Sequence, residues 1–208
     1  MQTLFSRFLA AATLLAAASF APQALAQNAA FVELNPAQPT DEPGKVEVLE
    51  FFAYSCTHCN AIEPLVNDWS KKLPDNAVLR KVPVAFNAGM KPLQQLYFTL
   101  EAMNRLDLHS KVFASIHQER QRLSTKDQIA DWAGKQGLDK AKFQSIYDSF
   151  GVQSKAQRAD QLVQAYRVQG TPSIAVGGRY LTSPDRAGGY RETLQVADQL
   201  LARVNAAK

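Results

Sequence analysis

The two cysteines of the 208-residue chain, Cys56 and Cys59, are separated by two residues and stand between a strand pattern and a helix pattern. The preceding segment, 45–53, begins with alternating apolar residues and ends as a continuous apolar run, which is typical of a strand buried on both faces of a sheet. Apolar residues then recur at helical spacing over 57–73, and 78–86 again has a strand pattern. This order predicts a right-handed βαβ unit, with the cysteine pair where its helix begins.

The first 26 residues match the three-part pattern of a secretory signal peptide. A short segment with Arg7 precedes the apolar stretch 8–21, and the segment 24–26, Ala-Leu-Ala, provides a small-residue cleavage site. The apolar stretch is shorter than the ~20 residues that a membrane-spanning helix needs. We therefore expect 1–26 to be a signal peptide that directs the mature chain into an oxidising compartment.

A long helical segment separates the two halves of the remaining chain. Over 87–169 we find no strand pattern, whereas apolar residues recur at helical spacing in five groups. We therefore expect 87–169 to be a helical domain inserted into an α/β domain that is formed by 27–86 and 170–208. The five groups are Leu93–Met103, Val112–Ile116, Ile129–Trp132, Phe143–Phe150 and Ala159–Tyr166.

The segment after residue 170 predicts a hairpin and a final helix. Strand patterns at 173–176 and 179–182 flank Gly177-Gly178, whose freedom to adopt positive φ suits a two-residue turn. The last helix carries its apolar stripe from Tyr190 to Val204. A short strand pattern at 31–34 fits the edge of the same sheet.

The placement of Cys56 at a helix N-terminus favours a thiolate. The first amides of a helix are unpaired there, and the aligned peptide dipoles present partial positive charge. Cys59, three residues later, lies on the same face one turn on, close enough to form a disulfide with Cys56. The pair is therefore expected to be a redox centre.

Three other interpretations of the pair have to be compared with this one. A structural disulfide would close a loop of ~4 residues and stabilise the fold by only about 2 kcal/mol, against nearly 5 for a loop of ~100. A zinc site would lack ligands, because no further cysteine is present and His109 and His117 stand eight residues apart with no partner pattern. Two unrelated free thiols would not need this placement.

Residues 46–208 resemble the DsbA family in motif, order and spacing, through VEVLEFFAYSCTHC, the helical segment, GTPSIAVGGRY and a last helix. The resemblance implies an α/β, thioredoxin-like fold with a helical domain inserted between the βαβ and ββα halves. It also implies a bacterial periplasmic thiol:disulfide interchange protein, an oxidoreductase that donates its Cys56–Cys59 disulfide to newly exported proteins with free cysteines. No cofactor beyond this disulfide is implied.

The resemblance further implies a monomer that is reoxidised by a DsbB-like, quinone-coupled membrane partner. A nucleic-acid partner is not expected, since the formal net charge is +4 and no block of basic residues occurs. A disulfide reductase, a disulfide isomerase and a non-catalytic thioredoxin-like binding domain remain alternatives. Isomerases of this compartment usually add a dimerisation domain, for which the segment before Val46 is short.

The resemblance assigns roles to residues of this chain. Cys56 resembles the exposed attacking cysteine and Cys59 the buried one, while Thr171 and Pro172 resemble the cis-proline loop that faces the disulfide and the substrate. Thr57 stands where the family often has proline, and Thr171 where close relatives often have valine. The remaining assigned positions are His58 between the cysteines, the charged pair Glu50 and Lys81 beneath the site, and the nearby carboxylate Glu63.

Two of these side chains have chemistry that supports a functional role. An imidazolium at His58 would attract a neighbouring thiolate. Glu50 stands within an apolar strand, where a carboxylate is unfavourable unless it is paired or exchanges protons. His109 and His117 lie in the helical segment, and the sequence assigns them packed or solvated positions without chemistry.

Overall fold

The computed structural model describes residues 30–207, so the signal peptide predicted over 1–26 lies outside the described residues. Its centre is a five-stranded sheet of order β1-β5-β4-β2-β3. Strands β2 and β3 are parallel, and the pairs β2–β4, β4–β5 and β1–β5 are antiparallel. The strands are β1 (Val32–Glu33), β2 (Val46–Phe52), β3 (Ala77–Pro83), β4 (Ser173–Val176) and β5 (Tyr180–Thr182).

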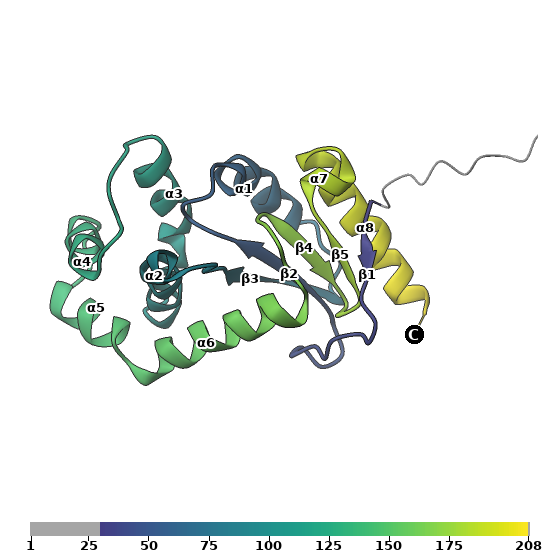
Figure 1. The fold of residues 1–208 in the computed structure, drawn as a ribbon, viewed down its shortest axis with the longest axis horizontal. Coiled ribbons are helices and arrows are strands. Elements are labelled where there is room, and N and C mark those ends of the chain that lie inside the picture. Colours follow the sequence, from purple (N-terminus) through teal and green to yellow (C-terminus); the bar gives the residue numbers. More distant parts are fainter. Residues whose placement is uncertain (1–29, 208) are drawn as a thin grey trace, which may run out of the picture.

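Helix α1 (Thr57–Ser70) connects β2 to β3, which confirms the predicted βαβ unit. Between β3 and β4 lie α2 (Lys91–Ala102), α3 (His109–His117), α4 (Lys126–Lys135), α5 (Lys140–Tyr147) and α6 (Phe150–Ala165), with single 3₁₀ turns at Ala88–Met90 and Leu106–Leu108. After β5 come α7 (Pro184–Ala187) and α8 (Tyr190–Ala206). Figure 1 shows α2–α6 gathered beside one end of the sheet, with α6 running back toward β4. The boundaries of the inserted domain at 87 and 169 stay a prediction.

Strand β2 runs through the middle of the sheet and is buried along its whole length. Val46 and Val48 belong to a cluster of apolar side chains that α1 and α8 also supply. Leu49 and Phe51, which point to the opposite face, belong to a larger cluster that continues through α2–α6 as far as Trp132. The helical segment and this face of the sheet therefore share one hydrophobic core.

Two element boundaries differ from the sequence prediction. The strand predicted to reach Phe86 ends at Pro83, because its partner β2 ends at Phe52 and the last ladder bond runs from the N–H of Val84 to the carbonyl oxygen of Phe52. Phe150, predicted to lie on the apolar stripe of the fourth inserted helix, is instead the first residue of α6 and 86% exposed. Ser149 causes this break, since its hydroxyl accepts a hydrogen bond from the N–H of Val152 and caps a new helix.

The hairpin between β4 and β5 has the predicted turn. Gly177 and Gly178 have φ of 59° and 70°, the positive values of a two-residue turn that matches the twist of its strands. A Cβ atom on Gly178 would lie 2.1 Å from the carbonyl oxygen of Gln38. Glycine is required there for both conformation and space.

Among residues 30–207, no helix has the length and apolar character needed to cross a membrane.

Candidate active site

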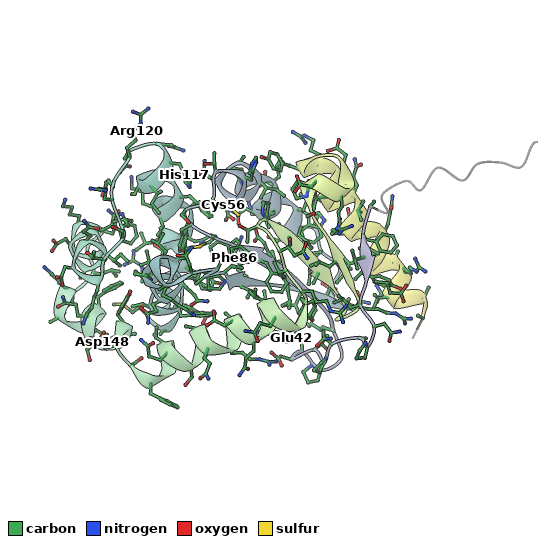
Figure 2. All side chains as sticks on the ribbon, in the orientation of Figure 1. Glu42, Cys56, Phe86, His117, Arg120 and Asp148 are labelled. Carbon is green, nitrogen blue, oxygen red and sulfur yellow. The ribbon has the colours of Figure 1, made fainter. Side chains whose placement is uncertain are left out.

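Cys56 stands at the junction between β2 and α1. Its N–H donates to the carbonyl oxygen of Ala53, which turns the chain out of the sheet, and its sulfur accepts a hydrogen bond of 3.3 Å from the N–H of Cys59. The residue is thus the N-cap of α1, as the sequence predicts. Figure 2 shows Cys56 where α1 meets the helical segment.

The surroundings of Cys56 favour its thiolate. They lower its pKa from 9.0 to about 5, chiefly because the thiol of Cys59 donates to the sulfur. Partial burial opposes this change, whereas the side chain of Thr171 and the backbone N–H groups of Cys59 and His58 add to it. A sulfur of this kind is ionised at neutral pH and is both a ready nucleophile and a good leaving group.

Cys59 has the opposite character. Its side chain is 1% exposed, and burial together with the neighbouring Cys56 sulfur raises the pKa of its thiol. Both cysteines are present as free thiols. The pair therefore combines an accessible, acidic thiol with a buried, weakly acidic one.

The loop before β4 lies against the sulfur of Cys56. The Thr171–Pro172 peptide bond is cis, as the resemblance implies, and the carbonyl oxygen of Thr171 lies 3.2 Å from the sulfur, where it accepts a hydrogen bond from the neutral thiol. A cavity of about 610 Å³ opens beside this loop and is lined by His58, Thr171, Pro172 and residues of α7. Pro172 itself has no N–H, so it donates no backbone hydrogen bond at this position of the loop.

The side chain of His58 is held by a residue that the sequence predicted only as part of the apolar stripe of the last helix. Its Nδ1 lies 2.7 Å from the hydroxyl oxygen of Tyr190, the first residue of α8. The contribution of His58 to the low pKa of Cys56 comes from its backbone N–H. Thr57, the other residue between the cysteines, is exposed at the first position of α1.

The three charged residues named by the resemblance meet beneath the cysteines. Lys81 of β3 places its Nζ 2.5 Å from Oε2 of Glu50 on β2 and 2.8 Å from Oε2 of Glu63 on α1. The two carboxylates are 0% and 3% exposed. The ammonium group thus bridges two carboxylates in the interior.

The pKa values in this cluster move in different directions. Burial raises the pKa of Glu50 more than Lys81 lowers it. For Glu63, burial is the largest single influence and would raise the pKa, but His109 and Lys81 together outweigh it and the pKa is lowered. The two carboxylates raise the pKa of Lys81 against the effect of its own burial. Glu50 is therefore the carboxyl group in the cluster that most readily holds a proton.

His109 and Tyr54 complete this cluster, although no role was predicted for either residue from the sequence. His109 on α3 is 5% exposed, its Nε2 lies 3.2 Å from Oε1 of Glu63, and its Nδ1 lies 2.7 Å from the hydroxyl oxygen of Tyr54. His117, at the other end of α3, has its Nε2 2.8 Å from the carbonyl oxygen of Tyr54. No local signal reveals these contacts, because α3 is far from Tyr54 in the sequence.

Comparisons with known proteins identify the family of this chain. A family model described as a DSBA-like thioredoxin domain matches residues 87–195, and one described as thioredoxin matches 31–95. The thiol:disulfide interchange protein DsbA of Bordetella parapertussis is 58% identical over 203 residues, which cover 97% of each chain. The chain belongs to the DsbA family.

Solved structures of DsbA proteins extend this result to the fold. The crystal structure of Pseudomonas aeruginosa DsbA is 39% identical and has a TM-score of 0.83 over 86% of this chain and 94% of that one. The predicted thioredoxin-like fold and the predicted thiol:disulfide interchange activity are confirmed by this membership.

Within residues 30–207, no group of three or more His, Cys, Asp or Glu side chains is placed to hold a metal ion.

Proposed function

We propose that this chain is an exported oxidant of the bacterial periplasm, which transfers the Cys56–Cys59 disulfide to unfolded proteins with free cysteines. The DsbA family supplies the thiol:disulfide interchange chemistry. The direction of transfer is supported by the contrast between the two sulfurs. Cys56 is accessible with a pKa of about 5, and Cys59 is buried with a raised pKa.

A stable thiolate at Cys56 makes the reduced protein the favoured product. A substrate thiolate attacks the Cys56 sulfur of the disulfide, which forms a mixed disulfide and releases Cys59 as a thiolate that takes up a proton. A second substrate thiolate then attacks the substrate sulfur and releases Cys56 as a thiolate. Two substrate thiols become one disulfide, and this protein takes up the two electrons.

Substrate binding is assigned to the loop at Thr171 and Pro172 and to the cavity beside it. The cavity beside Thr171 and Pro172 gives an extended chain room to approach the sulfur of Cys56, which lies against the carbonyl oxygen of Thr171. Recognition then depends more on the substrate backbone than on particular side chains. Thr57 and His58 border the same site from α1.

The remaining parts of the proposal concern the cellular setting. The apolar stretch and small-residue site over 1–26 support export with signal-peptide cleavage. The protein would act as a monomer and without a cofactor, since the disulfide itself carries the electrons. A DsbB-like membrane protein would take these electrons and pass them to a quinone.

The deciding experiment is the redox equilibrium of the Cys56–Cys59 pair against glutathione, followed by trapping the thiols at acidic pH. An oxidant stays largely reduced in a buffer poised at about −200 mV, whereas a reductase with a potential of about −270 mV becomes largely oxidised. Catalysed oxidation of a reduced, unfolded protein should accompany the first result and be lost in Cys56→Ser. Binding of unfolded chains that survives this substitution without any thiol exchange would instead indicate a binding domain.

A further inference from the structure

His109 is the member of the buried cluster that comes from the helical segment. Glu50, Glu63 and Lys81 belong to β2, α1 and β3 of the α/β domain. His109 reaches them from α3, with its ring packed edge-on against Phe52 at 5.0 Å and Tyr97 at 5.7 Å between centroids. These aromatic contacts bury the imidazole and constrain the direction of both ring nitrogens.

Polar atoms in this cluster lack hydrogen-bond partners. Oε1 of Glu63 and Nε2 of His109 lie 3.2 Å apart without the angles of a formed hydrogen bond, and neither has another partner. Oε1 of Glu50 is also unpaired. Unsatisfied buried polar atoms are unfavourable, and each one in a folded protein needs an explanation, of which a role in catalysis is one.

The charges of the cluster balance only when it holds one additional proton. Two ionised carboxylates, Glu50 and Glu63, face the single ammonium of Lys81, which leaves one uncompensated negative charge in an interior where it is strongly unfavourable. A proton on Glu50 removes this charge, and so does a second proton on His109. Either location makes the cluster neutral.

The Tyr54 hydroxyl can form its hydrogen bond with His109 whether the additional proton is on Glu50 or on His109. When His109 is neutral, the Tyr54 hydroxyl donates to its Nδ1, and when His109 is protonated, Nδ1–H donates to the same oxygen. In both states Nε2 carries a hydrogen toward Oε1 of Glu63. The ring does not have to turn for the proton to arrive or leave.

The cluster lies next to the buried cysteine. Glu63 follows Cys59 by four residues, so the two side chains stand one above the other on α1. Tyr54 precedes Cys56 by two residues in the loop after β2. Cys59 needs a proton when it leaves the disulfide and loses one when it attacks.

We propose that His109 is a positioning residue for thiol exchange, which keeps Glu63 ionised against Lys81 and shares with Glu50 the one proton that the cluster exchanges with Cys59. When the disulfide opens, the proton passes from the cluster to the Cys59 sulfur. When Cys59 attacks a mixed disulfide, the proton returns to the cluster. This rests on the proposed function only in requiring thiol exchange at Cys59.

The test measures how fast Cys59 resolves a mixed disulfide between Cys56 and glutathione, between pH 5 and 8. We expect His109→Gln to slow this step about fivefold to tenfold at neutral pH and to flatten its pH profile, since groups in contact couple by this amount. The titratable groups that face His109 are Glu63 from α1, Tyr54, Glu50 and Lys81 from the sheet side, and Tyr97 from α2.

The control is His117→Gln, which removes the second histidine that contacts Tyr54 from α3 but lies outside the cluster. It should leave the resolution step within about twofold of the parent protein. Equal slowing by His109→Gln and His117→Gln would mean that α3 acts only by holding Tyr54, and would overturn the proposal.

If Glu50 and His109 share one proton, the effects of replacing them should not be independent. In Glu50→Gln the cluster is neutral without an additional proton, so His109→Gln should have no further effect in that background. If the double variant slows the resolution step by the product of the two single slowing factors, the proposal is overturned. Redox titration against glutathione separates this result from the proposed function, because a reducing potential would reject the oxidant while leaving the coupling measurable.

Infrared difference spectroscopy follows the proton directly and does not depend on exchange rates. The carbonyl stretch of a protonated buried carboxyl group should grow in His109→Gln, because Glu50 is then the only site for the proton, and it should vanish in Glu50→Gln. An unchanged band in a folded His109→Gln protein would show that His109 holds no share of the proton.

Discussion

The hydroxyl oxygen of Tyr190 lies 2.7 Å from Nδ1 of His58, which ties the start of α8 to the first turn of α1. The two residues are 132 positions apart, yet their rings stand 6.3 Å apart between centroids. This contact occupies Nδ1 of the His58 imidazole. The orientation of His58 is therefore set by α8 as well as by its own helix.

Replacing Tyr190 by phenylalanine should make the protein more oxidising. The substitution keeps the ring but removes the hydroxyl, so the imidazole of His58 becomes free to turn toward the Cys56 thiolate and stabilise it. We expect the equilibrium constant with glutathione to shift about twofold to fivefold toward the reduced protein. In a His58→Ala background the same change should have no effect, and a persisting shift would show that Tyr190 acts by another route.

The acidity of Cys56 can be measured by its rate of alkylation. Reaction with iodoacetamide should reach half its maximal rate near pH 5, because the pKa of Cys56 is about 5, while Cys59 stays unmodified in the folded protein. The sites of modification are identified by mass spectrometry of peptides. Comparable rates at Cys56 and Cys59 would contradict the assignment of the attacking sulfur.

Cys59 itself should be a cause of that acidity. The hydrogen bond that the Cys59 thiol donates to the Cys56 sulfur is the largest cause of the lowered pKa of Cys56. Cys59→Ala should therefore move the alkylation midpoint to higher pH. Cys59→Ser, which keeps a donor, should move it less. An unchanged midpoint in Cys59→Ala would assign the low pKa to the helix N-terminus alone.

The relative stability of the reduced and oxidised forms should depend on pH. The folded pKa of Cys56 lies below the ordinary value of 9.0, so thiolate stabilisation of the reduced form is complete above about pH 9 and is lost as pH falls through about 5. Between these limits the reduced form should gain up to about 1.4 kcal/mol per pH unit relative to the oxidised form.

The disulfide opposes this gain with about 2 kcal/mol from its short loop. At neutral pH the thiolate contributes a similar amount once solvent screening at the half-buried sulfur is considered, so the two forms should be about equally stable there. Above neutral pH the reduced form should have the higher urea midpoint. A difference between the midpoints that does not change between pH 5 and 9 would exclude the linkage.

Gly178→Ala should destabilise the hairpin between β4 and β5. The residue has φ of 70°, and a Cβ atom would lie 2.1 Å from the carbonyl oxygen of Gln38, so both strain and backbone clash contribute. We expect a loss of more than about 3 kcal/mol in the free energy of unfolding. Gly44→Ala is the matched control, because φ is 79° there but nothing lies within 4 Å, and it should lose only about 1 kcal/mol.

Sequence patterns predicted the local elements of this protein well. The alternation and apolar run before Cys56, the helix pattern after it and the glycine pair at 177–178 each act within a few residues, so β2, α1 and the hairpin are found where expected. The N-cap position of Cys56 is local in the same sense, because it depends only on where one helix begins. Phe150 was misplaced because two equally local signals, an apolar spacing and the capping serine before it, competed.

The sequence by itself thus determined which sulfur stands at a helix N-terminus, and therefore which of the two cysteines forms the thiolate. Only the tertiary structure decided which groups adjust that chemistry, because it brings His109 to Glu63 and Tyr190 to His58 from distant helices. Burial and hydrogen-bond direction set the charge of such groups, and both depend on how separate elements pack. Capping and helix dipoles act along one stretch of backbone, whereas the balance of buried charge exists only after the chain has folded.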